Sequence, residues 1–202
     1  MSVEIDVERT IGETRVALSI TAAGPGATVL FGPSGVGKTS VLNMVAGLLR
    51  PDRGRIVVGG RQLFGDGIDV PVEQRRAGYV FQEPRLFPHL NVRSNLLYGR
   101  RNPGAAQALP ATTGFLGIAH LLDRWPHSLS GGEARRVAIG RALLSDPAFL
   151  LLDEPLASLD GARREEIMRA IEHIRDALAL PILMVTHDPA EAERLATRIV
   201  RM

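Results

Sequence analysis

The stretch ATVLFGPSGVGKTSVLNMVAGLL, residues 27–49, decides the fold of this chain. Residues 27–31 are an apolar run of the kind expected for a strand that is covered on both faces. A glycine-rich turn follows at once, and residues 40–49 are expected to form a helix. A strand, a glycine turn and a helix in this order are typical of a phosphate-binding unit in an α/β protein.

The glycine turn matches the pattern G-x-x-x-x-G-K-[ST] over residues 32–39. Glycines let such a loop wrap so that backbone amides point inward, and the following helix adds positive potential at its N-terminus. We therefore expect Lys38 to reach the β and γ phosphates of a nucleotide and the Thr39 hydroxyl to ligate magnesium. The alternative is an ordinary glycine turn, and the flanking strand and helix argue against it. The predicted phosphate loop comprises Gly32, Pro33, Ser34, Gly35, Val36, Gly37, Lys38, Thr39 and Ser40.

A second apolar run, AFLLLDEP at residues 148–155, ends in two carboxylates. A strand here would place Asp153 at the carboxyl edge of the sheet, where open α/β sheets bind ligands. We expect Asp153 to hold magnesium, directly or through water, and Glu154 to orient or deprotonate an attacking water. The alternative is that both acids cap the strand and accept surface hydrogen bonds.

Two further apolar runs end in polar side chains. Gln82 ends AGYVFQ, residues 77–82, and His187 follows ILMVT, residues 182–186. A lone glutamine or histidine at a strand end is usually a surface residue, but the ends of parallel strands meet in one crevice. We therefore expect Gln82 to contact magnesium and water, and His187 to donate a hydrogen bond to the γ phosphate.

The segment SLSGGEARR, residues 128–136, contains two adjacent glycines with no lysine beside them. Ser130 and Glu133 fit a capping box at the start of a helix. That helix start needs neither Gly131 nor Gly132, which lower helical stability unless something must approach the backbone closely. If this segment binds a phosphate, another part of the site has to supply the positive charge.

The remaining pattern alternates strands with helices, which predicts an α/β protein with a mostly parallel sheet. Strands are expected at residues 3–7, 14–20 and 55–60. A helix is expected over residues 161–178 with Asp160 as its N-cap, and Asp188 followed by Pro189 opens the last helix. Residues 101–114, rich in proline, glycine and alanine without periodicity, are expected to form a surface loop.

Composition narrows the class of protein. A chain of 202 residues is long enough for one substantial core, alone or with a subdomain attached. The net charge of +2 is too small to indicate nucleic-acid binding, and the absence of cysteine excludes disulfides and thiolate-bound metals. We expect no secretory leader, and no apolar run approaches the roughly 18 residues that a membrane span needs.

The motifs GPSGVGKT, FQ, LSGGE, LLLDEP, SLD and TH, in this order, resemble the ATP-binding subunits of ABC transporters over nearly the whole chain. The resemblance implies a P-loop NTPase fold with a mostly parallel central sheet, a small antiparallel β region and an inserted helical subdomain. It further implies one ATP-binding domain over residues 1–202, with residues 1–82 and 147–202 as the catalytic core and 83–146 as the helical subdomain. A carboxyl-terminal regulatory domain is expected to be absent.

In this family two ATP-binding domains form a head-to-tail homodimer around ATP and Mg²⁺. The resemblance implies that Ser130, Gly131 and Gly132 bind the γ phosphate of the nucleotide in the partner's phosphate loop. The lysine missing beside the glycines would then be the partner's Lys38. Ser158, Leu159 and Asp160 resemble the segment that crosses the dimer interface.

Within the family, residues 78–99 and the segment SLSGGEARRVAIGRALL are most similar to the ATPase subunits of molybdate importers. This resemblance implies an ATPase that powers the import of molybdate or a similar oxyanion from the cytoplasmic face of the membrane. The implied partners are integral membrane permease subunits and, indirectly, a periplasmic or extracellular binding protein, with no nucleic acid. The groove for the permease would include Phe87, Pro88, His89 and Leu90.

Three alternatives remain: an ABC ATPase that acts outside transport, a P-loop kinase for small molecules, and nucleotide binding without catalysis. The chain also departs from the family pattern at two positions. Ile11 stands where importer ATPases usually carry an aromatic residue that stacks on adenine, and Arg135 stands where glutamine is common.

Overall fold

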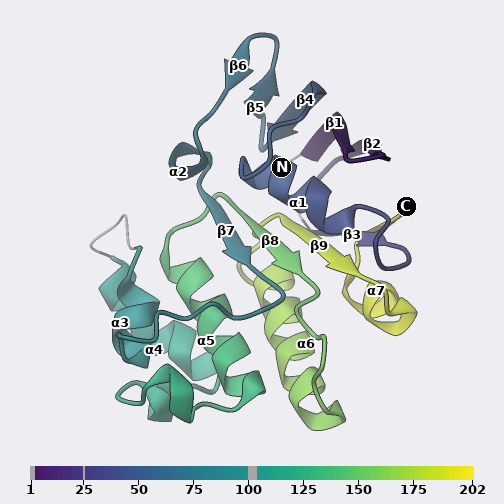
Figure 1. Cartoon of the computed structure of the whole chain (residues 1–202). Coiled ribbons are helices and arrows are strands. Elements are labelled where there is room, and N and C mark those ends of the chain that lie inside the picture. Colours follow the sequence, from purple (N-terminus) through teal and green to yellow (C-terminus); the bar gives the residue numbers. More distant parts are fainter. Residues whose placement is uncertain (1–2, 25, 100–103) are drawn as a thin grey trace.

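The computed structural model describes residues 3–24, 26–99 and 104–202, with residue 105 described by its backbone alone. These residues form two five-stranded sheets with helices around them (Figure 1). One sheet is antiparallel, in the order β2-β1-β4-β5-β6, and the other is parallel, in the order β10-β3-β9-β8-β7. The antiparallel strands are β1 (Val3–Ile11), β2 (Thr14–Ala22), β4 (Arg53–Val58), β5 (Arg61–Gly65) and β6 (Ile68–Asp69). The parallel strands are β3 (Ala27–Phe31), β7 (Ala77–Val80), β8 (Phe149–Asp153), β9 (Ile182–Thr186) and β10 (Arg198–Arg201).

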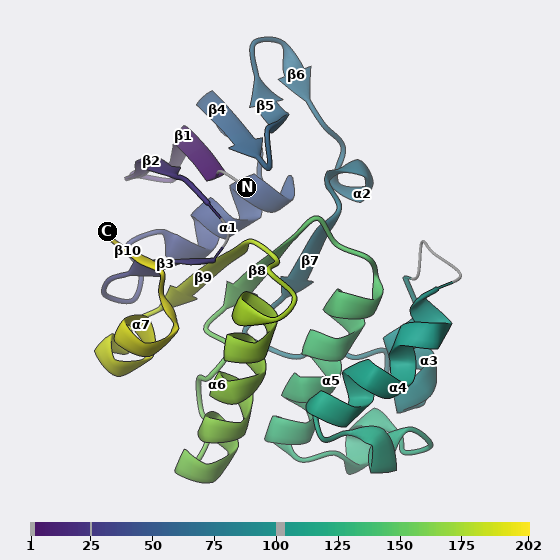
Figure 2. The same cartoon turned by 180° about the vertical axis from the view of Figure 1, so that it is seen from behind.

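The burial of the strands explains their sequence patterns. All residues of β8 and β9 are buried, because helices or the other sheet cover both faces of the parallel sheet. In β2, buried and exposed residues alternate from Val16 onward, as expected for a strand with one face in the core. Helix α1 (Lys38–Ala46) lies between the two sheets and buries Val41, Leu42 and Met44 against both (Figure 2). The antiparallel sheet and the parallel sheet therefore share one core through α1.

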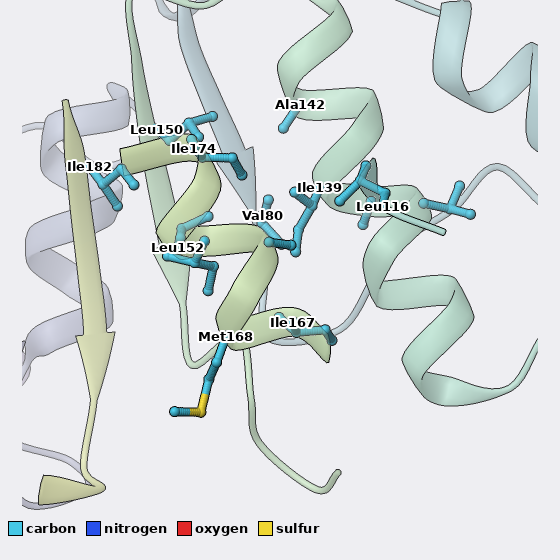
Figure 3. Close-up of a cluster of buried hydrophobic side chains, with 14 of the residues drawn as sticks. Val80, Leu116, Ile139, Ala142, Leu150, Leu152, Ile167, Met168, Ile174 and Ile182 are labelled. Atoms are coloured by element: carbon cyan, nitrogen blue, oxygen red, sulfur yellow. The ribbon is translucent and has the colours of Figure 1, made fainter. Parts of the chain in front are cut away.

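The other face of the parallel sheet is covered by α5 (Gly131–Leu144) and α6 (Gly161–Asp176), with α7 (Pro189–Leu195) beside them. Figure 3 shows Val80 of β7 and Leu150 and Leu152 of β8 packed among the isoleucines of α5 and α6. The predicted caps are confirmed, since the Asp160 carboxylate accepts from the Arg163 amide and that of Asp188 accepts from the Ala190 amide.

The helices α3 (Val92–Leu97), α4 (Ala105–Phe115), the short 3-10 turns η1 (Ala119–Leu121) and η2 (Pro126–Ser128), and α5 follow one another between β7 and β8. A one-turn helix, α2 (Val72–Arg75), precedes β7. In the part of the chain that the structure describes, no helix combines the length and the apolar character needed to cross a bilayer.

The prediction of a surface loop over residues 101–114 was wrong from residue 105 onward, and residues 101–103 lie outside the described part. Helix α4 packs against α5, burying Leu109 and Thr113. The Thr113 hydroxyl donates to the Leu109 carbonyl at 2.9 Å, even though Pro110 lies inside the helix. Alanine favours helix, and packing on α5 outweighs the proline, so the tertiary contact overrides the local breaker signal.

Candidate nucleotide site

A cavity of about 350 Å³ lies where the phosphate loop meets the carboxyl ends of the parallel strands. Its lining joins residues far apart in the sequence: Ser34, Gly35, Gly37, Lys38, Thr39, Ser40, Gln82 and Glu154. Gln82 also lines two neighbouring cavities. One, of about 270 Å³, includes Glu154 and His187, and the other, of about 390 Å³, includes Thr39 and Asp153. The structure thus brings the predicted strand-end residues together around the phosphate loop.

Two glycines of the loop adopt backbone conformations that other residues avoid. Gly35 has φ +84° and Gly37, the residue before α1, has φ +104°. A Cβ atom at Gly37 would lie 2.7 Å from a methyl carbon of Val16, whereas one at Gly35 would meet nothing within 4 Å. Gly37 is therefore required both by its φ angle and by the close packing of β2.

The Lys38 ammonium group is held by the loop itself. It donates to the carbonyl oxygens of Gly32 at 2.8 Å and Pro33 at 2.7 Å, and the residue is only 4% exposed. These bonds keep a positive charge beside the N-terminus of α1, whose first amides have no partner within the helix. The combination of lysine, loop and helix N-terminus is suited to a phosphate group.

Thr39 and Asp153 form the oxygen-rich side of the cavity. The Thr39 hydroxyl donates to a carboxylate oxygen of Asp153 at 2.9 Å. Burial raises the pKa of Asp153, the charge of Glu154 raises it further, and the Thr39 hydrogen bond and Lys38 act in the opposite direction. Burying a carboxylate is costly without a cation, so this position favours one.

The oxygen atoms at this side of the cavity suit magnesium, which fills part of its coordination with water and substrate phosphates. Among the described residues, no group of three or more histidine, cysteine, aspartate and glutamate side chains could hold a metal ion. The hydroxyl of Thr39, the amide oxygen of Gln82 and the carboxylate of Asp153 are hard oxygen ligands. Mg²⁺ prefers such ligands, keeps several waters and commonly shares its coordination with substrate phosphates.

Glu154 occupies an unusual backbone conformation directly after β8. Its φ is +44°, and its amide donates to the Val185 carbonyl of β9 at 3.1 Å. A left-handed conformation costs a residue with a side chain about 1–2 kcal/mol, and such strain is concentrated at functional sites. One carboxylate oxygen lies 3.3 Å from Nδ1 of His187, which is 54% exposed, whereas the Glu154 side chain is 17% exposed. Glu154 and His187 therefore form a pair at the edge of the cavity.

A polar network supports the loop that carries His187. The Thr186 hydroxyl donates to the buried Glu191 carboxylate at 2.6 Å, and burial raises the pKa of Glu191. On the same loop, Asp188 accepts a hydrogen bond at 2.9 Å from Arg164 of α6. Sequence reasoning missed Arg164, which lines the His187 cavity, because nothing local distinguishes it from neighbouring arginines.

The predicted capping box at the start of α5 is confirmed. The Glu133 amide donates to the Ser130 hydroxyl at 3.3 Å, and the Ser130 amide donates to the Glu133 carboxylate at 2.7 Å. Gly131 is exposed, and a Cβ there would meet nothing within 4 Å, while one at Gly132 would lie 3.0 Å from the Arg163 side chain. None of the three residues 130–132 lines the 350 Å³ cavity. Packing within one copy of the chain therefore does not explain Gly131.

The residues predicted for the dimer interface and the permease groove lie outside the phosphate cavity. Ser158 lines the His187 cavity and has φ +62°. Ile11, which stands at the position where an aromatic residue would stack on adenine, lies at the end of β1 and is 42% exposed. Phe87 packs against Tyr98, with ring centroids 4.1 Å apart. Pro88 and His89 are exposed, and Leu90 is half-buried.

The 390 Å³ cavity beside Gln82 contains residues that sequence reasoning did not select. Tyr79 stacks on Phe81 at 4.0 Å and donates to the Asn43 side chain at 3.0 Å, and the Arg85 guanidinium lies 4.2 Å from the Phe81 ring centroid. The apolar strand pattern concealed Tyr79 and Phe81, since both fit a buried strand.

Comparison with known proteins gives consistent matches. A family model described as ABC transporter matches residues 17–157. The Molybdenum import ATP-binding protein ModC of Rhizobium meliloti is 51% identical over 212 residues, covering 100% of this chain and 58% of the relative. The protein of that name from Brucella abortus is 56% identical over 183 residues, covering 89% of this chain and 51% of the relative. The chain thus spans about half the length of the curated relatives it matches.

Two solved structures share the fold over the whole chain. One is a dimeric ATP-binding cassette in a post-hydrolysis state bound to ADP and phosphate. It has a TM-score of 0.79 and 26% identity, and the match covers 100% of this chain and 94% of that one. The other is cbiO1 from Clostridium perfringens, part of the ABC transporter complex cbiONQ. Its TM-score is 0.84 at 26% identity, and the match covers 100% of this chain and 84% of that one.

Proposed function

Because this chain belongs to the ABC transporter family, we propose that it hydrolyses ATP to power an importer of molybdate or a similar oxyanion. The cargo rests on the relatives named as molybdenum import proteins. One observation supports catalysis most strongly: the Thr39–Asp153 hydrogen bond and the Glu154–His187 pair flank the cavity of the phosphate loop.

Each part of the loop has a proposed role. Backbone amides of residues 32–40 bind the phosphates, and Lys38 exchanges its bonds to the Gly32 and Pro33 carbonyls for bonds to the β and γ phosphates. Thr39, Gln82 and Asp153 hold magnesium, directly or through water. Magnesium, when bound, supplies neutralisation of the phosphate charge.

Hydrolysis requires a water to attack the γ phosphorus while the bond to the β-phosphate oxygen breaks. We assign to Glu154 the orientation of this water and acceptance of its proton. His187 donates a hydrogen bond to the γ phosphate, and its contact with Glu154 aligns the two side chains. ADP and inorganic phosphate are the products.

The site is completed by a second copy of the chain in a head-to-tail dimer. Ser130, Gly131 and Gly132 close over the partner's γ phosphate with the N-terminus of α5, while Asp160 and its neighbours cross the interface. The open space around Gly131 and the dimeric state of the related cassette support this arrangement. ATP binding closes the dimer and hydrolysis reopens it.

The same proposal assigns residues 1–82 and 147–202 to the catalytic core and 83–146 to the helical subdomain. Permease subunits dock near Gln82 on the cytoplasmic face of the membrane, and a substrate-binding protein acts through them. Co-purification of the permease followed by uptake of labelled molybdate tests the cargo. Transport of an unrelated solute, with no competition by molybdate or tungstate, would contradict it.

The catalytic proposal is tested with Glu154→Gln. This variant is expected to bind ATP and form a stable ATP-dependent dimer, because it keeps the binding groups and removes the proton acceptor. Size-exclusion chromatography measures the ATP-dependent dimer, and phosphate release measures the expected loss of hydrolysis. Wild type plus ADP is the control for the dimer. A monomer at saturating ATP would count against the shared site, and a phosphorylated acceptor in place of free phosphate would favour a kinase.

A further inference from the structure

Two arginines of α5 donate hydrogen bonds to backbone carbonyls on both sides of Gln82. Arg135 donates from Nη1 to the Phe81 carbonyl at 3.0 Å. Arg141 donates from Nη1 to the Arg85 carbonyl at 3.0 Å and from Nη2 to the Pro84 carbonyl at 3.3 Å. The chain that leaves β7 runs across α5 on its way to α3 (Figures 1 and 2). The segment of residues 81–85 is therefore fastened to α5 immediately before and shortly after Gln82.

Burying these two guanidinium groups costs free energy. Arg135 is only 6% exposed, and its Nε is buried without a partner among the described residues. Burial lowers the pKa of both Arg135 and Arg141, and for Arg135 the nearby charge of Asp153 acts in the opposite direction. Even a buried ion pair is often no more stabilising than well-packed apolar residues, and the hydrogen bond of Arg135 goes to a neutral carbonyl. Packing alone therefore gives little reason for a guanidinium at Arg135.

The same helix carries the residues proposed to meet the partner's nucleotide. Helix α5 starts at the Ser130 capping box, and Arg135 lies about one turn after Gly131. A helix of this length moves as a rigid element, so a shift of its N-terminus is passed to the arginines. Their hydrogen bonds join the helix to the backbone of residues 81–85, which includes Gln82 at the phosphate cavity of the same copy.

We propose that Arg135 and Arg141 are positioning residues that couple the α5 N-terminus, docked on one nucleotide, to Gln82 beside the other. This inference rests on the proposed function for the contact between copies. It gives the buried Arg135 side chain a specific role. Each of the two sites in the dimer would then have its Gln82 set by closure on the opposite site.

Hydrogen–deuterium exchange tests the coupling in the Glu154→Gln protein. ATP-dependent dimerisation is expected to slow exchange in residues 81–87. Adding Arg135→Met should leave the dimer intact and remove this protection, with exchange in the segment faster by about tenfold, the effect of one charge-assisted hydrogen bond. Arg136→Met is the matched control, because Arg136 is adjacent on α5 but pairs with Glu166 of α6 at 2.7 Å. General destabilisation would instead speed exchange in β8 and β9 as well.

A double-mutant cycle with Gln82→Ala tests whether Arg135 acts through Gln82. Arg135→Met should lower kcat for ATP hydrolysis about tenfold with little change in KM, and should have no further effect once Gln82 is alanine. Unchanged protection of residues 81–87 in an intact dimer, or fully multiplicative losses of kcat, would overturn the coupling. If the Glu154→Gln protein did not dimerise with ATP, that result would instead refute the proposed function on which the coupling rests.

Discussion

Gly37→Ala separates the structural role of the phosphate loop from its binding role. Gly37 has φ +104°, and an added Cβ would lie 2.7 and 2.8 Å from the two methyl carbons of Val16. Val16 is 3% exposed and belongs to β2, so it has little room to yield. A β-branched side chain is also restricted in χ1, which limits the relief available by rotation.

The expected loss of stability has two parts. A left-handed backbone costs a non-glycine residue about 1–2 kcal/mol. Overpacking a full core costs about 1–3 kcal/mol. The lower entropy of alanine in the unfolded chain offsets about 0.4–1 kcal/mol. The free energy of unfolding should therefore fall by about 1–4.6 kcal/mol, which lowers Tm by roughly 2–18 °C for a chain of this size.

Gly35→Ala is the matched comparison. Gly35 also has a positive φ, +84°, but a Cβ there would meet nothing within 4 Å. Its stability loss should be limited to about 1 kcal/mol, from backbone strain less the entropy offset. Both glycines line the phosphate cavity, but a Cβ at Gly35 would enter open space and not the side chain of Val16, so the added methyl group should instead weaken ATP binding.

Thermal and urea denaturation of the nucleotide-free proteins measure the first effect, and titration calorimetry with ATP measures the second. Equal Tm shifts for the two variants would refute the reasoning, because they would show that the contact with Val16 contributes nothing. A larger loss of ATP affinity for Gly37→Ala than for Gly35→Ala, at temperatures where both are folded, would contradict the assigned division of roles.

Three further outcomes follow from the structure. Lys38→Ala should weaken ATP binding roughly ten- to hundredfold by calorimetry, since it removes charge-assisted bonds to phosphate. Arg75→Met should lower the free energy of unfolding in urea by about 3–5 kcal/mol, because the Met44 and Val45 carbonyls at the end of α1 would each lose a charged donor. Arg194 and then Arg169 hold the pKa of Glu165 at about 2, below the ordinary 4.5. The stability from these pairs is thus present above pH 4.5 and lost as pH falls toward 2, so the Tm difference between wild type and Glu165→Gln should vanish over that interval.

A specific result would refute each of these three predictions. Unchanged ATP affinity in Lys38→Ala would remove the phosphate-loop assignment. An Arg75→Met protein as stable as wild type would show that the end of α1 is satisfied without the arginine. A Tm difference for Glu165→Gln that persists unchanged at pH 2, or that disappears only at high salt, would show that the carboxylate is not the titrating partner.

The candidate nucleotide site was accessible to sequence reasoning because its elements have strong local patterns. The glycines of residues 32–37 and the apolar runs of β3, β8 and β9 each specify a backbone conformation locally. Parallel strands end at one edge, so placing Asp153 and His187 near the phosphate loop needed only the alternation of strands and helices. Assigning Gln82 to the same edge followed in the same way, although β7 ends two residues before it.

Other features depended on contacts between distant segments. The helical state of α4 depends on packing against α5, and the strands β6 and β10, of two and four residues, are too short to show a period. Arg164 reaches Asp188 across 24 residues of sequence, and Arg135 reaches Phe81 across 54.

The sequence by itself determined which residues are candidates for phosphate chemistry and at which edge of the sheet they gather, because glycine geometry and strand period act over a few neighbouring residues. Only the tertiary structure decided why alanine at position 37 is destabilising, and how α5 holds the backbone around Gln82. The physical reason is that a buried methyl contact or an arginine–carbonyl bond depends on the path of the chain in space, which no local periodicity encodes.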